Sequence, residues 1–130
     1  LVDRAVENEL LPLCADQQIA LVTYSPLAAG FLTGKYRRGG EIPEGSRFDV
    51  RPGHQPLYMH DAGFAVLDRL EAAAERTGQS MVHLALAWVM AQPAVTSVLI
   101  GARSPAQVDQ AFDARDLALS DETISQLGGA

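Results

Sequence analysis

The most informative segment of the chain reads Leu21-Val-Thr-Tyr-Ser-Pro-Leu-Ala-Ala-Gly-Phe-Leu-Thr-Gly-Lys-Tyr36, and a second one reads Ser97-Val-Leu-Ile-Gly-Ala-Arg-Ser-Pro-Ala-Gln107. Each segment begins as a short apolar run and ends in small and polar residues. An apolar run without alternation is typical of a parallel strand that is covered on both faces. The carboxyl ends of parallel strands meet at one edge of a sheet, where α/β proteins bind ligands. The two segments therefore predict two strand ends that bind an anionic ligand together.

The rest of the chain alternates helical patterns with these two strands. Apolar residues at helical spacing predict a first helix over residues 4–17 and another over 63–77, with Gly78 as its terminator. Ser80, Ser104 and Ser120 are each placed to start a further helix. Residues 37–62 are polar and rich in Gly and Pro, so a long functional or mobile loop is expected there.

This order of elements indicates an α/β fold with a parallel sheet. The strands are expected over residues 19–24 and 97–101. Two parallel strands cannot cover their own faces, so partner strands must come from elsewhere in a larger fold.

Length and composition restrict the class of protein. The chain has 130 residues, which suits one domain, and its formal net charge of −6 argues against nucleic acid or an anionic membrane as partners. No apolar stretch approaches the roughly 20 residues that cross a bilayer. Cys14 is the single cysteine and is expected to be buried; without a disulfide framework, a reducing, cytoplasmic location is expected. Because the chain begins at Leu1 within a helical pattern, we expect a fragment of a longer protein rather than a processed chain.

Several familiar catalytic and binding motifs are absent from the sequence. Gly30 and Gly34 before Lys35 are separated by three residues, whereas a phosphate-binding P-loop needs four. The Gly-rich Rossmann fingerprint is missing, and no Ser-His-Asp set is recognisable. The three histidines, at positions 54, 60 and 83, fit no metal-ligand spacing. We therefore predict no metal site and no Ser-His-Asp triad in this chain.

The second strand end has the chemistry of an anion site. Gly101 lets a ligand approach the backbone, and the free N–H groups of Ser104, Ala106 and Gln107 are expected to point out of a helix N-terminus. Arg103 can bind a phosphate through two hydrogen bonds. The alternative is an ordinary helix start beside a solvated arginine, and this segment alone does not choose between them.

The first strand end offers a ring and further cations. Tyr24 could support the planar ring of a cofactor, or pack its own ring and keep its hydroxyl in water. Lys35 and Arg47 could add positive charge to the ligand site, or remain surface cations.

The two segments together resemble the aldo-keto reductases, in the branch that includes bacterial reductases and potassium-channel β subunits. The matching residues follow one another in order along nearly the whole chain. They are Glu9-Leu-Leu-Pro-Leu-Cys14, Tyr24-Ser-Pro-Leu27, Gly34-Lys-Tyr36, Ser46-Arg47, Ala85-Leu-Ala-Trp-Val89, Gln92-Pro93, Gly101-Ala-Arg103 and Gln107.

The resemblance implies a (β/α)₈ TIM barrel, with residues 1–130 as its C-terminal portion carrying strands 7 and 8 and their helices. The family's catalytic Asp, Tyr, Lys and His lie on earlier strands and have no counterpart here. The full-length protein would reduce aldehydes or ketones, whereas this chain would be an inactive, partial barrel domain. Its partners would be the remainder of the barrel and a small carbonyl substrate.

The resemblance also implies that the cofactor is NADP(H). Tyr24 would stack on the nicotinamide, Arg103 would bind the 2′-phosphate, and Gln107 would contact the adenine. The other expected contacts are Ser25, Pro26, Leu27, Ala28, Ala29, Lys35 and Arg47 around the pyrophosphate, and Gly101 at the adenosine end.

The chain departs from the family pattern at Gln110 and Ala111, where relatives often carry Glu and Asn, so an adenine contact is weakened there. Two other functions stay open. One is a non-catalytic module that senses cofactor or binds a partner, as in the channel-associated relatives. The other is an unrelated α/β nucleotide binder, which would be favoured if the two strands were not parallel neighbours.

Overall fold

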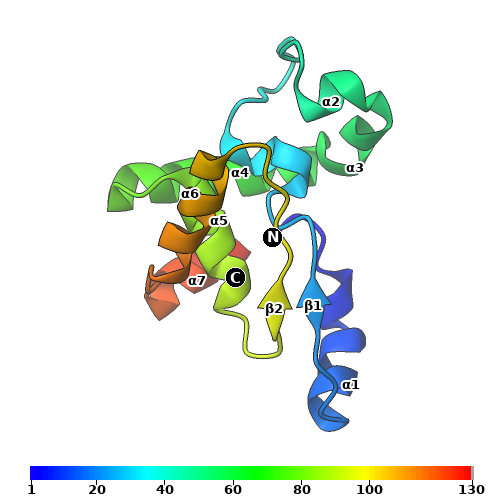
Figure 1. Cartoon of the computed structure of the whole chain (residues 1–130), viewed down its shortest axis with the longest axis vertical. Helices are drawn as coiled ribbons and strands as arrows, with labels where there is room; N and C mark the ends of the chain where they lie inside the picture. The colour runs from blue at the N-terminus through cyan, green and yellow to red at the C-terminus, as the bar shows by residue number, and fades with distance from the viewer. Residues whose placement is uncertain (130) are drawn as a thin grey trace.

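The structure is a computed structural model that describes residues 1–129, and it forms a small parallel sheet surrounded by helices (Figure 1). The elements in chain order are η1 (Ala5–Glu7), α1 (Leu10–Asp16), β1 (Val22–Thr23), η2 (Ala28–Thr33), α2 (Arg47–Val50), η3 (Pro52–His54), α3 (Gln55–Tyr58), α4 (Asp61–Thr77), α5 (Met81–Met90), β2 (Ser97–Val98), α6 (Pro105–Arg115) and α7 (Asp121–Gly128); η denotes a 3₁₀ helix. Helices α4 to α7 lie on one side of the sheet, whereas α1 lies beside β1.

The two strands are parallel neighbours, as predicted. Val22 lies opposite Ser97 and Thr23 lies opposite Val98. This pairing argues against the unrelated nucleotide binder. Helices α4 and α5 lie between the two strands in the chain, which is the crossover that parallel strands require. The ends of both strands therefore point toward η2, α2 and α3 at the top of Figure 1.

The strands are shorter and more exposed than predicted. The runs 19–24 and 97–101 contain only two strand residues each, because each strand has a single neighbour to bond with. The prediction that they are buried is wrong for this chain, since the side chains of Val22 and Leu99 are 50% and 59% exposed. An apolar surface of this kind is normally covered by further strands and helices.

Several helices begin and end at the residues that the sequence predicted. The hydroxyl of Ser80 accepts the His83 amide at 3.1 Å, and that of Ser120 accepts the Thr123 amide at 3.2 Å. Gly78 ends α4 with φ of 70°, in the left-handed region that favours glycine. The predicted first helix instead divides into η1 and α1, which leaves Pro12 in the first turn of α1.

The expected loop over residues 37–62 is the largest departure from the sequence prediction. It contains the short helices α2, η3 and α3, which are attached to the core through Phe48. The Phe48 ring stacks on Tyr36 at 4.3 Å between centroids and lies nearly parallel to Tyr58 at 6.1 Å. We call residues 47–58 the strap, because they form one continuous segment that contributes to the cleft described below.

The core lies between the helices and includes apolar residues that recur at helical spacing along the sequence. It is built around α4 and α5, with contributions from η2 and α7. Cys14 is buried, as expected, at 5% exposure, and Trp88 is buried at 4%. Leu27 and Val98, which lie close to the two strand ends in the chain, pack against this core.

Candidate functional site

A cleft of about 460 Å³ lies where the two strand segments leave the sheet. Its volume is within the range of about 300–1,000 Å³ that is common for small-molecule sites. It is formed by the segment after β1, the loop between β2 and α6, the strap, and residues of α5 and α6. The lining residues are Ser25, Pro26, Leu27, Ala29, Gly30, Thr33, Lys35, Arg47, His54, Tyr58, Val82, Leu86, Ile100, Gly101, Ala102, Arg103, Gln107, Gln110 and Ala111. All the predicted site residues except Tyr24 and Ala28 are among them.

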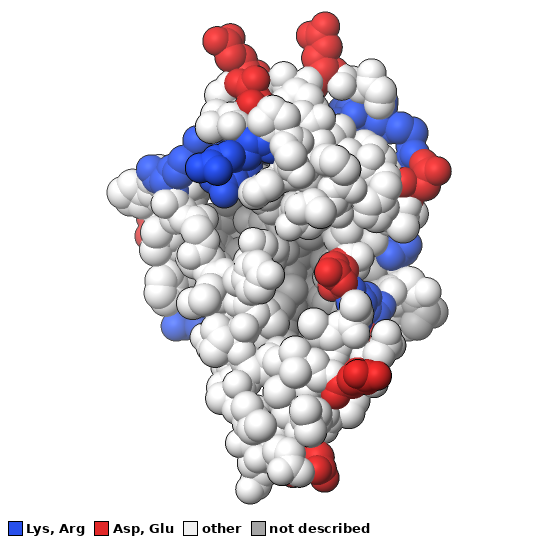
Figure 2. All heavy atoms as spheres, turned by 90° about the vertical axis from the view of Figure 1, so that its right-hand side faces the viewer, with Lys and Arg blue, Asp and Glu red and all other residues white. Residues whose placement is uncertain are grey.

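The charge of the cleft is opposite to that of the chain. Lys35, Arg47 and Arg103 line it together with His54, and none of the described residues around it is Asp or Glu. The chain as a whole carries a formal charge of −6. On the face that shows β1 and α1, Lys and Arg side chains gather above a central hollow (Figure 2). A cluster of cations on an acidic protein indicates an anionic ligand.

The turn after β1 has an unusual backbone. Ser25, Ala28 and Ala29 have φ values of 52°, 49° and 56°, in the left-handed region that residues with a Cβ rarely adopt. Hydrogen bonds hold this conformation, including Ala28 N–H to Ser25 C=O at 2.8 Å. Such strain is concentrated at ligand sites in proteins, because it places backbone groups where an unstrained turn cannot.

Gly30 makes room for the lysine of the cleft. A Cβ at position 30 would lie 3.1 Å from the Lys35 ammonium nitrogen, so a larger residue would displace that group. The same ammonium lies 5.3 Å from the centroid of the Tyr36 ring. The turn and the core aromatic together place this cation at the cleft.

The loop after β2 differs in detail from the predicted anion site. The Arg103 amide donates to the Gln107 side-chain oxygen at 2.7 Å, so this side chain is already engaged within its own loop. The Gln107 amide donates to the Ser104 carbonyl at 3.1 Å and is not free, contrary to the prediction. Ser104 precedes α6 as expected but forms no side-chain cap. The Arg103 side chain is exposed at the cleft.

The strap supplies the predicted Arg47 and two residues that the sequence did not single out. Arg47 begins α2, whereas His54 ends η3 and Tyr58 ends α3, and all three line the cleft. Burial raises the pKa of the Tyr58 hydroxyl, and the neighbouring Tyr24 raises it further. His54 and Tyr58 were missed because residues 37–62 were expected to be a loop.

Tyr24 and Ala28 line a second cavity of about 310 Å³ that shares Ser25, Pro26 and Tyr58 with the cleft. Tyr24 is 80% exposed, so no other part of the chain covers its ring. The two predicted ends of the ligand site, Tyr24 and Arg103, therefore lie on adjoining cavities rather than in one.

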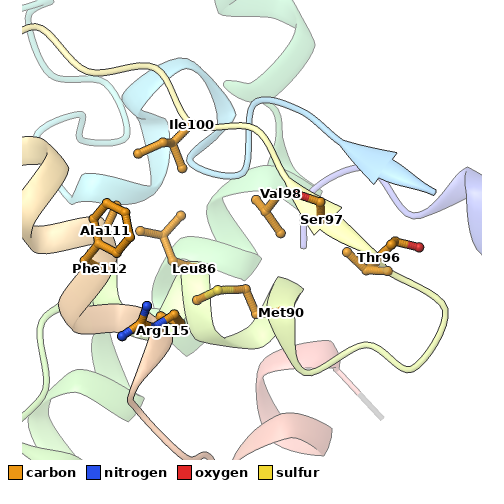
Figure 3. A pocket seen from close by; sticks show the side chains of 10 residues that line it. Leu86, Met90, Thr96, Ser97, Val98, Ile100, Ala111, Phe112 and Arg115 are labelled. Atoms are coloured by element: carbon orange, nitrogen blue, oxygen red, sulfur yellow. The ribbon is translucent and has the colours of Figure 1, made fainter. Parts of the chain in front are cut away.

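A third hollow, of about 400 Å³, lies between β2, α5 and α6 (Figure 3). Its walls are mainly apolar and include Met90, Val98, Ile100 and Phe112, with Arg115 at one side. Phe112 is 57% exposed and Ile100 is 42% exposed. The hollow has the character of an uncovered packing surface rather than of a polar ligand site.

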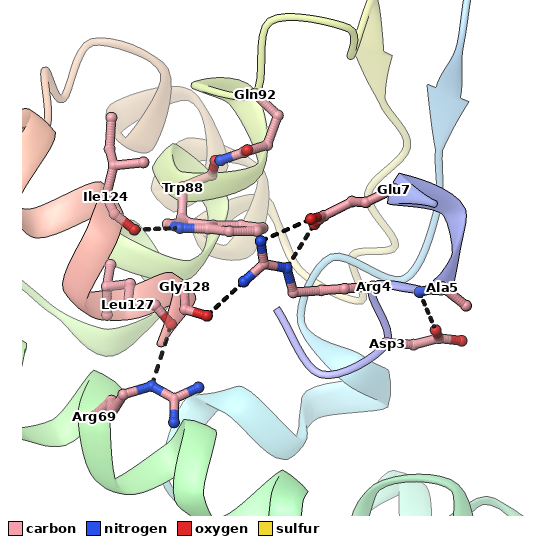
Figure 4. A network of polar contacts seen from close by, with 10 residues as sticks. All are labelled: Asp3, Arg4, Ala5, Glu7, Arg69, Trp88, Gln92, Ile124, Leu127 and Gly128. Carbon is pink, nitrogen blue, oxygen red and sulfur yellow. Dashed lines mark hydrogen bonds and ion pairs between the residues drawn. The ribbon is translucent and has the colours of Figure 1, made fainter. Parts of the chain in front are cut away.

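A polar network that includes Arg4, Glu7 and Trp88 from the lining of the second cavity links the N-terminal segment to α5 and α7 (Figure 4). The Arg4 guanidinium donates to both carboxylate oxygens of Glu7, at 2.6 and 2.7 Å, and also to the Gly128 carbonyl. It lies 5.4 Å from the ring of Trp88, whose Nε1–H donates to the Ile124 carbonyl at 2.9 Å. The N-terminal segment is thereby fixed to α5 and α7.

Residues 1–129 contain no group of three His, Cys, Asp or Glu side chains that could hold a metal ion. Within the same residues, no helix is both long enough and apolar enough to cross a membrane.

Comparisons with known proteins agree on one family. The family model described as Aldo/keto reductase family matches residues 1–130. The chain is 38% identical over 124 residues to an NADH-specific methylglyoxal reductase from Escherichia coli, which covers 93% of this chain and 36% of that protein. It is 38% identical over 115 residues to a probable voltage-gated potassium channel subunit beta from Arabidopsis thaliana, which covers 86% of this chain and 34% of that protein.

A solved structure is also similar to this chain. The glycerol dehydrogenase from Gluconobacter oxydans matches with a TM-score of 0.73 and 28% identity, over 98% of this chain and 38% of that one. The chain thus spans little more than a third of the length of the relatives that it matches.

Proposed function

The chain belongs to the aldo/keto reductase family, and on that basis we propose that it is the cofactor-binding, C-terminal portion of a barrel reductase that uses NADP(H). The complete protein would reduce aldehydes or ketones. The cationic cleft, at the ends of two parallel strands of an acidic chain, is the observation that carries this proposal.

The residues that line the cleft and the adjoining cavity would each contact a different part of the cofactor. Lys35 and Arg47 would bind the pyrophosphate, and the turn at residues 25–29 would lie along it. Tyr24 would support the nicotinamide ring from the adjoining cavity. A nicotinamide cofactor supplies the hydride when it is bound, so the work of these residues is to bind and orient it.

The preference for NADP(H) over NAD(H) depends on Arg103. This exposed guanidinium can bind a 2′-phosphate through two hydrogen bonds. Gly101 and Gln107 would complete the adenosine end, with the Gln107 side chain also fixing the loop through the Arg103 amide. Family membership does not choose between the cofactors, since the similar E. coli reductase is named as NADH-specific.

The remainder of the barrel would cover what this chain leaves exposed. This chain leaves exposed the apolar hollow of Figure 3, as well as Val22 and Leu99 in the two strand segments that further strands would extend. The acid–base residues of the family would also come from that remainder. We therefore propose that residues 1–130 alone do not reduce a carbonyl substrate. We also propose that the parent protein works in the cytoplasm, because Cys14 is a free thiol.

Calorimetric titration of the 130-residue chain with NADP⁺ tests the binding function. Lys35→Gln and Arg47→Gln should each weaken binding by about threefold to tenfold, as expected for a partly screened, charge-assisted hydrogen bond. Arg37→Gln is the matched control, because Arg37 pairs with Glu71 at 3.1 Å outside the cleft. Equal effects of all three substitutions would refute a specific site.

The absence of turnover has its own test. NADPH oxidation is followed with an aldehyde such as 4-nitrobenzaldehyde, using protein purified from a host without background reductase. Steady consumption of NADPH would refute the proposal that catalytic residues are supplied from elsewhere.

A second function is a non-catalytic module that senses the cofactor or binds a partner. The similarity to a protein named as a probable potassium channel β subunit favours it. The sequence that precedes Leu1 in the parent separates the two functions. A catalytic Asp, Tyr, Lys and His set there would favour the enzyme, and its loss would favour the module.

A further inference from the structure

His54 is a fourth basic side chain on the cleft, beside Lys35, Arg47 and Arg103. It belongs to the strap, and the sequence pattern gave it no function. Histidine ordinarily changes its charge between about pH 5 and 8, which the other three cations do not. This position therefore adds a property to the cleft that its permanent cations lack.

The imidazole is attached to a well-fixed backbone. The His54 amide donates to the Arg51 carbonyl at 3.1 Å. The next residue, Gln55, donates its side-chain N–H to the Phe48 carbonyl at 3.1 Å, and Phe48 is fully buried. A side chain on such a frame can contribute to binding without first being ordered by the ligand.

The two ring nitrogens of His54 have different surroundings. Nδ1 is enclosed and has no hydrogen-bond partner among residues 1–129. Nε2 is not among the enclosed unpartnered atoms, and no described residue bonds to it. One nitrogen is thus accessible to a ligand, while the other would be an unpaired donor whenever the ring is charged.

We propose that His54 is an additional anion-binding residue of the cleft, which takes up a proton as a dinucleotide phosphate binds. This inference rests on the cofactor-binding function proposed above. His54 shares the cleft with Lys35, Arg47 and Arg103, and its Nδ1 is enclosed without a hydrogen-bond partner among the described residues.

The negative charge of a bound phosphate favours the imidazolium form of a histidine beside it. The remaining titratable group on the cleft is Tyr58, a phenol that is neutral in this pH range, and no carboxylate lines it among the described residues. Proton uptake and anion binding are therefore coupled, and the cleft binds more tightly as the pH falls.

The test is calorimetric titration of the 130-residue chain with NAD⁺ and with NADP⁺ at about pH 6 and about pH 8. NAD⁺ is the cleaner probe, because its phosphate diesters keep their charge across this range. We expect wild-type affinity for NAD⁺ to be about fivefold higher at the lower pH, and His54→Gln to reduce that ratio to below about twofold.

His83→Gln is the matched control. His83 also has an enclosed nitrogen without a partner, Nε2, but it lies on α5 and does not line the cleft. This variant should keep the wild-type pH dependence. Titrations in buffers of different ionisation enthalpy add a direct count of protons: uptake on binding by the wild type and by His83→Gln, and much less by His54→Gln.

The outcomes separate the two proposals. If the wild type binds neither dinucleotide at either pH, the cofactor-binding function fails and the role of His54 fails with it. If the wild type binds but His54→Gln keeps the same pH dependence and the same proton uptake, only the inference about His54 is overturned.

Discussion

Replacing Phe48 by alanine tests whether the strap is attached to the core in the way described. Phe48 has no exposed surface, and its ring stacks on Tyr36 at 4.3 Å and on Tyr58 at 6.1 Å. It also lies 6.4 Å from Phe31. The substitution would therefore remove a central member of an aromatic cluster and leave a cavity that the strap alone would have to fill.

The magnitude follows from known core substitutions. Removing a buried Phe side chain costs about 3–5 kcal/mol in the free energy of unfolding, and each aromatic pair adds roughly 0.5–1.5 kcal/mol to simple burial. The measured range for Phe→Ala already includes lost ring contacts, so we expect Phe48→Ala to cost about 4 kcal/mol. Phe48→Leu keeps most of the volume and should cost less than about 2 kcal/mol, so it stays measurable if the alanine variant is largely unfolded.

Urea unfolding followed by circular dichroism gives the free energies, and a series of protein concentrations separates unfolding from self-association. Phe112→Ala is the matched control, because Phe112 is 57% exposed and should lose less than about 1 kcal/mol. Equal losses for Phe48→Ala and Phe112→Ala would refute the argument that the strap is part of the folded core.

Three further predictions concern the cofactor, the exposed surface and the core. Arg103→Ala should weaken NADP⁺ binding by about tenfold or more while changing NAD⁺ binding by less than about threefold, measured by calorimetry; equal losses would contradict its role at the 2′-phosphate. The chain should self-associate through its uncovered strands, so light scattering should give a mass above 13.9 kDa that falls with Leu99→Glu; a monodisperse wild-type monomer would count against this. Trp88→Phe should lower the free energy of unfolding by about 1–2 kcal/mol, because the Ile124 carbonyl loses its donor; unchanged stability in urea would disprove that contribution.

Features set by neighbours in the sequence could be predicted well. Ser80, Ser120 and Gly78 act within one turn of their own helices, so the helix boundaries follow from local chemistry. The apolar runs that contain Val22 and Val98 identified both strands and their parallel pairing. These runs could not predict strand length, which depends on how many neighbouring strands are present.

Features set by distant contacts were missed. The Phe48 ring holds the strap against Tyr36 and Tyr58, and nothing in the Gly- and Pro-rich sequence around it indicates that contact. His54 became a candidate only when the structure placed it on the cleft. The engagement of Gln107 with the Arg103 amide was likewise invisible, because a side chain that can bind a ligand can equally bind its own loop.

The central claim is that both strand ends bind one dinucleotide. Amide chemical shifts of the isotopically labelled chain, recorded as NADP⁺ is added, test it most directly. We predict that residues 25–30 and 101–107 shift together with one dissociation constant, while α7 on the far side of the core is unaffected. Shifts confined to one strand end, or spread evenly over the whole chain, would contradict the claim.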